Sequence, residues 1–254
     1  MTTLFVSDLH LDSALPAAIA QFEQFLSGPA RGAEALYLLG DLFESWVGDD
    51  DDEAGREGVC AALRAYGATG VPCYACHGNR DFLLSMGFER RSGCRIIGDP
   101  TIIDLYGEGV LLTHGDALCT DDHAYQRLRS VVRTATWQRR FLSLPLATRR
   151  HLADAAREGS RAHTGLVAPE IMDANDAAVS AVLRAGGVRK VIHGHTHRPA
   201  VHEFMLDGQR AHRYVLGAWY EQGSYLHCTP GRYELVTLPR TPSALAASRG
   251  GGPE

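Results

Sequence analysis

Short apolar runs alternate with amphipathic segments along the chain. Apolar positions at helical spacing predict a helix over Leu15–Leu26, which Gly28-Pro29 ends, and we expect a second helix over Glu53–Tyr66. Five apolar runs each stop at a polar cluster and predict buried strands: Thr3–Ser7, Ala35–Leu39, Val71–Cys76, Val110–Thr113 and Val188–Ile192. Strands that alternate with helices indicate an α/β layered domain.

Residues 120–186 break this rhythm and predict three helices, over His123–Phe141, Leu146–Arg157 and Asn175–Ala185. Four antiparallel strands are expected after them: Val201–Leu206, His212–Leu216, Ser224–Cys228 and Tyr233–Leu238. We therefore expect a core made of residues 1–121 and 187–240, a helical cap over the strand ends at 122–186, and a disordered tail at 241–254.

The composition is that of a globular protein: 254 residues, 45% hydrophobic and 22% charged. No apolar run reaches the roughly 18 residues of a membrane span, and the first residues lack a signal-peptide pattern, so a cytosolic protein is expected. The six cysteines then predict reduced thiols. Cys73 and Cys76, three apart on a strand, should face opposite sides as core thiols.

Charge is distributed unevenly. The net charge of −5 argues against nucleic-acid binding by the chain as a whole, whereas residues 122–170 hold nine arginines, no lysine and four acids. This basic segment favours an anionic partner, either a phosphorylated ligand or an anionic membrane surface, and no feature calls for an obligate protein partner. The acidic run Asp49–Glu53 predicts a solvated loop, with an outer cation site as the alternative.

The clusters that follow the five predicted strands carry metal-type ligands. They are Asp8-Leu9-His10, Gly40-Asp41, Gly78-Asn79-Arg80-Asp81, His114-Gly115-Asp116 and Gly194-His195-Thr196-His197. One such cluster alone is more often a turn or a helix cap. Five in order, at the strand ends where α/β sheets bind ligands, indicate a shared metal site.

Seven of these side chains are possible ligands, which is too many for one ion but suits two ions with Asp41 between them. They are Asp8, His10, Asp41, Asn79, His114, His195 and His197. Oxygen and imidazole donors without thiolate favour Mn²⁺, Fe²⁺ or catalytic Zn²⁺. Two ions about 3.5–4 Å apart can activate water and stabilise phosphoryl oxygens in an in-line displacement.

The order of these motifs over residues 4–197 resembles the calcineurin-like metallophosphoesterase superfamily. The resemblance implies a β-sandwich flanked by helices and two Mn²⁺ ions at the strand ends. By the same resemblance Asp8, His10 and His197 hold one ion, Asn79, His114 and His195 hold the other, and Asp41 bridges them.

The sequence segments around these motifs resemble one bacterial branch of the superfamily, and the similarity extends to about Pro239. The segments are Val6–Leu11, Leu38–Glu44, Trp46–Asp50, His77–Leu83, His114–Asp122 and His193–Ala200. That branch hydrolyses the lipid-linked sugar UDP-2,3-diacylglucosamine in lipid A biosynthesis. The resemblance implies water attack at the α-phosphorus, giving UMP and 2,3-diacylglucosamine 1-phosphate, by a peripheral protein on the cytoplasmic face of the inner membrane.

Arg80 stands where many metallophosphoesterases carry a histidine as general acid. Arginine cannot act as an acid near neutral pH, but its planar fork can clamp phosphate. A phosphate leaving group needs little protonation, so Arg80 favours diphosphate cleavage; the alternative is a surface salt bridge to Asp81. The expected catalytic residues are Asp41, Asn79, Arg80, His114 and His195.

The resemblance also implies substrate contacts at Asn79, Arg80, Asp122, Tyr125, Arg157, Ser160, Thr164 and His195. Two positions depart from the branch: Thr164 replaces a frequent Asn and can still donate a hydrogen bond, whereas Val167 replaces a frequent Lys and cannot. Apolar cap residues are divided between helix packing and a groove for acyl chains beside a basic face. Asp81 and Asp116 are expected to orient metal ligands.

Two other functions stay open. One is a broader phosphodiesterase or nucleotide phosphatase of the same superfamily, against which the helical cap and Arg80 weigh. The other is a non-catalytic binding module on the same fold, against which the seven intact ligand positions weigh.

Overall fold

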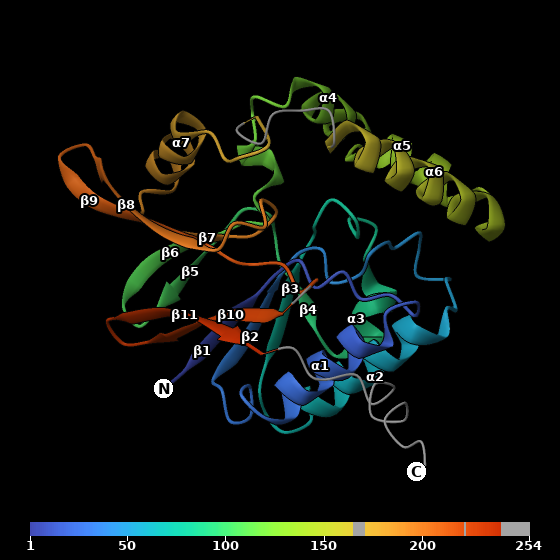
Figure 1. The fold of residues 1–254 in the computed structure, drawn as a ribbon, viewed down its shortest axis with the longest axis horizontal. Helices are drawn as coiled ribbons and strands as arrows, with labels where there is room; N and C mark the ends of the chain where they lie inside the picture. The colour runs from blue at the N-terminus through green and yellow to red at the C-terminus, as the bar shows by residue number, and fades with distance from the viewer. Residues whose placement is uncertain (165–170, 221, 240–254) are drawn as a thin grey trace, which may run out of the picture.

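The computed structural model describes residues 1–164, 171–220 and 222–239, and for residues 161–164 it describes the backbone only. Two β-sheets lie face to face (Figure 1). The first has the strand order β11 (Arg232–Leu238), β10 (Gly223–Thr229), β1 (Thr3–Val6), β2 (Ala35–Leu39), β3 (Cys73–Cys76) and β4 (Arg95–Ile96). The second has the order β5 (Thr101–Leu105), β6 (Glu108–Leu112), β7 (Lys190–His193), β9 (Gln209–Val215) and β8 (Ala200–Leu206).

Helices cover the outer face of each sheet. The first sheet carries α1 (Pro16–Ser27), α2 (Ala54–Gly67) and α3 (Met86–Ser92), and α7 (Asp176–Gly186) lies on the second. The segment between η1 (Asp116–Leu118) and α7 forms three further helices beyond the strand ends: α4 (His123–Val132), α5 (Ala135–Leu142) and α6 (Leu146–Thr164). Among the described helices, none has both the length and the apolar composition needed to cross a bilayer.

Alternating side chains on the central strands build three hydrophobic layers. Leu4 and Val6 of β1 pack toward α1 and α2, whereas Phe5 between them packs into the space between the sheets. On the second sheet Leu112 faces that same space and Leu111 packs against α7. Both faces of these strands are therefore buried, which explains why they are continuous apolar runs in the sequence. The expected β-sandwich flanked by helices is confirmed.

The structure also differs from the sequence prediction in several elements. α3, β4 and β5 were not predicted: α3 and β4 are short, and β5 is an edge strand that is only partly buried. The predicted helix His123–Phe141 is two helices, since Thr134 starts a new one by accepting a hydrogen bond from the amide of Trp137 at 3.3 Å. The predicted helix Leu146–Arg157 extends to Thr164.

All six cysteines are free and buried, and Cys73 and Cys76 lie in different hydrophobic layers, as their spacing predicted. The acidic run, by contrast, is only partly solvated: Asp50 and Asp52 are exposed, but its other residues are not. Asp51 is fully buried and pairs with Arg56 and with Arg150 of α6, and the Asp49 carboxylate accepts the amide of Gly87 at 2.6 Å. The proposed disordered tail, 241–254, lies outside the described residues.

Candidate metal centre and substrate pocket

The sheet topology brings the five polar clusters to one edge of the sandwich. β1, β2 and β3 are parallel neighbours in one sheet, and β6 and β7 are parallel neighbours in the other. Their carboxyl ends therefore lie together, which is where residues after each strand meet. All seven predicted ligands are at this edge.

Five of the seven predicted ligands adopt a left-handed backbone conformation, with φ of 55° at Asp8, 49° at His10, 52° at Asp41, 68° at His195 and 57° at His197. Non-glycine residues rarely adopt this conformation, and each costs the fold free energy. The chain leaves each strand in a sharp turn that aims the side chain inward. Strain gathered on these residues is typical of a functional site.

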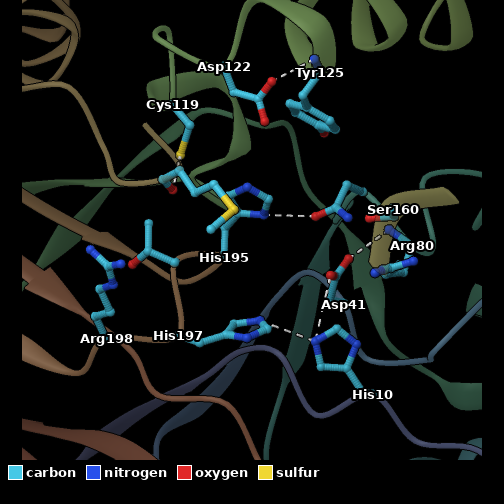
Figure 2. Close-up of a pocket in the computed structure, with 13 residues that line it drawn as sticks. His10, Asp41, Arg80, Cys119, Asp122, Tyr125, Ser160, His195, His197 and Arg198 are labelled. Atoms are coloured by element: carbon cyan, nitrogen blue, oxygen red, sulfur yellow. Dashed lines mark hydrogen bonds and ion pairs between the residues drawn. The ribbon is translucent and has the colours of Figure 1, made fainter. Parts of the chain in front are cut away.

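Asp8, His10 and His197 form the first half of the cluster. The Nε2 atoms of His10 and His197 are 3.4 Å apart (Figure 2). His197 Nε2 also lies 3.3 Å from Asp8 Oδ1. His10 Nε2 lies 3.9 Å from Asp41 Oδ2, so Asp41 adjoins this half.

Asn79, His114 and His195 form the second half. The Asn79 side-chain oxygen lies 2.9 Å from His114 Nε2 and 2.9 Å from His195 Nδ1. His114 Nδ1 lies 2.9 Å from the Leu39 carbonyl, which fixes it as the donor and leaves Nε2 facing Asp41 Oδ1 at 3.7 Å. Asp41 thus lies between the two halves, as a bridging ligand would.

The donor set fits divalent cations. Asp8 is fully buried, and its Oδ1 atom has no hydrogen-bond partner among the described residues. A buried carboxylate without such a partner is costly unless a cation meets it. Burial alone would lower the pKa of His114. The nearby carboxylates outweigh burial and raise that pKa to about 9, which reflects the negative potential that they create; they belong to Asp41, Asp8 and Asp116. Burial, with His114 acting in the same direction, lowers the pKa of His195 to about 3, so that imidazole is neutral and able to ligate.

Buried contacts hold Asp41 in place. Asp81 accepts hydrogen bonds from the backbone amides of Asp41 at 3.2 Å, Leu42 at 2.8 Å and Gly78 at 2.9 Å. Asp81 therefore orients the Asp41 turn, as expected. This arrangement also disfavours the alternative of a surface Arg80–Asp81 salt bridge, because Asp81 is fully buried and bonded to backbone amides.

Two side chains that contact His10 were missed by sequence reasoning. Glu44 Oε2 lies 3.0 Å from His10 Nδ1, and the Tyr220 ring stacks on the His10 ring with centroids 4.8 Å apart. Glu44 follows Asp41 by only three residues, but no spacing rule marks it as a partner of His10. Tyr220 comes from the far end of the chain, and its approach depends on the fold.

A pocket joins the metal-ligand cluster to the cap helices. Arg80 lines it on one side beside Ser160 of α6, and Arg198 lies on the other side of His195 (Figure 2). Asp122, which caps α4 by accepting the Tyr125 amide at 2.9 Å, also lines it. The predicted substrate residues gathered in this pocket are Asn79, Arg80, Asp122, Tyr125, Ser160 and His195.

The other two predicted substrate residues are Arg157 and Thr164. Arg157 does not line the pocket; its guanidinium lies 3.6 Å from Asp12 and 3.9 Å from Glu44, next to the carboxylate that holds His10. The Thr164 side chain and Val167 lie outside the described residues.

Asp116 anchors the cap to the core. Its Oδ2 atom accepts hydrogen bonds from Tyr125 Oη at 2.6 Å and from Arg129 Nε at 2.8 Å, and Arg133 donates to the Gly78 carbonyl at 3.0 Å. Tyr125, Arg129 and Arg133 are four residues apart and share one face of α4 and the residue after it. Asp116 was expected to orient a metal ligand; the hydrogen bonds that it accepts position α4 over the site.

A paired-sheet fold with clustered carboxylate, amide and imidazole ligands at the strand ends defines a metallophosphoesterase. Residues 1–199 match the family model of the calcineurin-like phosphoesterases, and the chain belongs to that family. A solved archaeal phosphodiesterase shares the fold, with a TM-score of 0.50 and 14% identity over 94% of this chain and 100% of the other.

Two relatives in the sequence comparison share one enzyme name. The UDP-2,3-diacylglucosamine hydrolase of Salmonella arizonae is 48% identical over 239 residues, covering 94% of this chain and 100% of the relative. The protein of the same name from Aeromonas salmonicida is 51% identical over 241 residues, covering 94% and 95%. At these identities the chain belongs with the UDP-2,3-diacylglucosamine hydrolases inside the phosphoesterase family.

Proposed function

We propose that this protein hydrolyses the diphosphate bond of UDP-2,3-diacylglucosamine, with water attack at the α-phosphorus, in lipid A biosynthesis. The products are UMP and 2,3-diacylglucosamine 1-phosphate. The observation that carries the proposal is a single pocket that unites the metal-ligand cluster, the Arg80 guanidinium and residues of the helical cap. A broader phosphodiesterase would need the cluster but not the cap.

We assign two Mn²⁺ ions to the cluster, with Asp8, His10 and His197 for one, Asn79, His114 and His195 for the other, and Asp41 shared. When bound, two such ions acidify water to give a nucleophile at neutral pH and neutralise charge on the phosphoryl oxygens. The two halves of the cluster and the position of Asp41 between them support this division.

The chain's own residues complete the reaction. Arg80 clamps the phosphate oxygens, because its Nε atom is buried without a hydrogen-bond partner among the described residues and its side chain lines the pocket. Arg80 supplies charge rather than a proton, and the leaving phosphate monoester needs none at neutral pH. His195, neutral by burial, and Asn79 orient the diphosphate beside the cluster.

The cap binds the lipid half of the substrate. Asp122, Tyr125 and Ser160 face the pocket from α4 and α6, and we assign the glucosamine and its acyl chains to this side, with Arg157 and Thr164 as further contacts. We take the cap to be residues 122–186 of the chain. Within that segment α4 to α6 extend beyond the strand ends, and α7 packs on the second sheet.

α4 and α5 support a peripheral position on the cytoplasmic face of the inner membrane. Neither helix has a buried residue, and α4 docks through polar contacts to Asp116 while Leu128 is 57% exposed and Val131 53% exposed. An apolar face turned outward beside arginines suits the surface of an anionic membrane, where the substrate resides.

The test is hydrolysis of UDP-2,3-diacylglucosamine with Mn²⁺, in water enriched in ¹⁸O, by wild type and Asp41→Ala. We expect the label in UMP, and loss of activity in EDTA and in the variant. Label in the lipid phosphate would move the attack to the other phosphorus. A wild type loaded with Mn²⁺ that cleaves a chromogenic phosphodiester but not the UDP lipid would favour the broader phosphodiesterase.

A further inference from the structure

The pocket has a second end that the proposed lipid contacts do not use. Arg80 and Ser160 lie on one side of His195, and Cys119 and Arg198 lie on the other (Figure 2). Met172, whose carbonyl accepts the Cys119 thiol at 3.3 Å, and Thr196 also line the pocket. Met172 precedes α7 and Arg198 follows β7, so this end belongs to the sandwich rather than to α4 to α6. A diphosphate that joins a nucleoside to a lipid needs space on both sides of the reacting phosphorus, and this end of the pocket is free of the proposed lipid contacts.

The Asp173 carboxylate holds the Arg198 guanidinium. The Nη1 atom of Arg198 lies 3.1 Å from Asp173 Oδ2, and the other oxygen of Asp173 lies 3.5 Å from Nη1 of Arg213, which is only 6% exposed. Asp173 also accepts the amide of Ala174 at 2.7 Å. One carboxylate thus faces two guanidiniums. The Arg198 side chain remains 45% exposed at the pocket.

The chemistry of this end fits a nucleoside monophosphate. A guanidinium fork matches the oxygens of a phosphate or the hydroxyls of a ribose, and a thioether such as that of Met172 packs well against an aromatic ring. We propose that Arg198, supported by Asp173, is a binding residue for the nucleotide half of the substrate and that Met172 lies against its base. This inference rests on the proposed function for the substrate, but it makes a claim about nucleotide binding that can be measured without turnover.

Direct binding provides the test. UMP and 2,3-diacylglucosamine 1-phosphate are each titrated into the Mn²⁺-loaded full chain by calorimetry, for wild type, Arg198→Gln and Arg210→Gln. We expect Arg198→Gln to weaken UMP binding about tenfold or more, as loss of a charge-assisted contact does, and to change the affinity for the lipid product less than twofold. Arg210, which is exposed and pairs with Glu203 on the second sheet, is the matched control and should leave both affinities unchanged.

A second variant tests the contribution of Asp173 to nucleotide binding. Asp173→Asn keeps the side-chain shape but removes the charge that holds Arg198, and it should weaken UMP binding less than Arg198→Gln does. The content of Mn²⁺ is measured in each variant, because Arg198 follows the predicted ligand His197.

The outcomes separate the two claims. Unchanged UMP binding in Arg198→Gln, or an equal loss of UMP and lipid-product binding, overturns the inference. Failure of wild type to cleave the UDP lipid overturns the proposed substrate alone, since UMP binding that depends on Arg198 would still establish a nucleotide site at this end of the pocket.

Discussion

Glu44 Oε2 lies 3.0 Å from Nδ1 of His10, on the opposite side of the imidazole from the cluster that Nε2 faces. The charge of the carboxylate at this distance favours a proton on Nδ1, which leaves the lone pair of Nε2 available to a cation. A carboxylate behind a metal-ligating histidine also raises the basicity of the ligand.

The first prediction removes that carboxylate's charge. Glu44→Gln should weaken Mn²⁺ binding about 10–100-fold, and excess Mn²⁺ should restore much of the activity. The measurement is Mn²⁺ affinity by titration with a competing chelator. Glu57→Gln, at an exposed residue paired with Arg91, is the control. Equal affinity in both variants would show that Glu44 does not support the ligand.

The second prediction concerns the close approach of the turns that carry Asp41 and Asn79. A Cβ at Gly78 would lie 2.1 Å from Asp41 Oδ1 and 2.2 Å from the Asp41 amide. Because backbone must move, Gly78→Ala should displace Asp41, abolish metal-dependent activity and remove the rise in Tm that we expect Mn²⁺ to produce in wild type.

The matched control for this change is Gly58→Ala, on an exposed turn of α2 where an added Cβ meets no atom within 4 Å. It should raise the free energy of unfolding by about 0.5–1 kcal/mol, because alanine favours helix over glycine. A Gly78→Ala protein with wild-type activity would mean that the turns can separate without losing the metals.

The third prediction tests how α6 is attached. Arg149 is 2% exposed; it donates to Asp50 Oδ1 at 2.8 Å and to the Val47 carbonyl at 2.5 Å. Arg149→Ala should lower the free energy of unfolding by about 1.5–3 kcal/mol, the range for hydrogen bonds to a charged group. It should also speed amide hydrogen exchange in α6, measured by mass spectrometry.

Arg140→Ala, on the exposed side of α5, is the control and should change stability by less than about 0.5 kcal/mol. If exchange in α6 were the same in both variants, the cap would be held by contacts other than the acidic loop.

The fourth prediction addresses the outward apolar face of α4. Leu128→Asp should reduce binding to phosphatidylglycerol vesicles about tenfold, because a buried leucine contributes about 1.5–3 kcal/mol. Vesicle sedimentation measures the bound fraction. Met205→Asp, 64% exposed on β8, should bind as wild type does. Equal loss in the two variants would indicate a general charge effect rather than a membrane-facing helix.

The candidate ligands could be found from the sequence because each follows an apolar strand directly. Parallel strands place their carboxyl ends at one edge, so a residue two positions after the strand is positioned by the strand itself. Asp41 after β2 and His114 after β6 are examples, and the structure brings them within 3.7 Å of each other.

Other features depend on contacts between distant segments. The acidic run at Asp49–Glu53 was expected to be solvated, because a run of carboxylates predicts exposure when its partners are unknown. The distant partners, Arg149 for Asp50 and Arg150 for Asp51, lie about a hundred residues later, and Asp51 is fully buried. Tyr220 on His10 and Arg198 beside Asp173 likewise depend on where the last strands return.

The sequence by itself determined most of the strands, the order of the candidate ligands and the family. Strands buried on both faces are continuous apolar runs, and the sharp turns after them carry polar clusters that the sequence shows directly. Only the tertiary structure decided what holds the candidate ligands in place and which side chains share the pocket with them. Those relations arise between segments far apart in the chain, where geometry rather than residue spacing sets the distance.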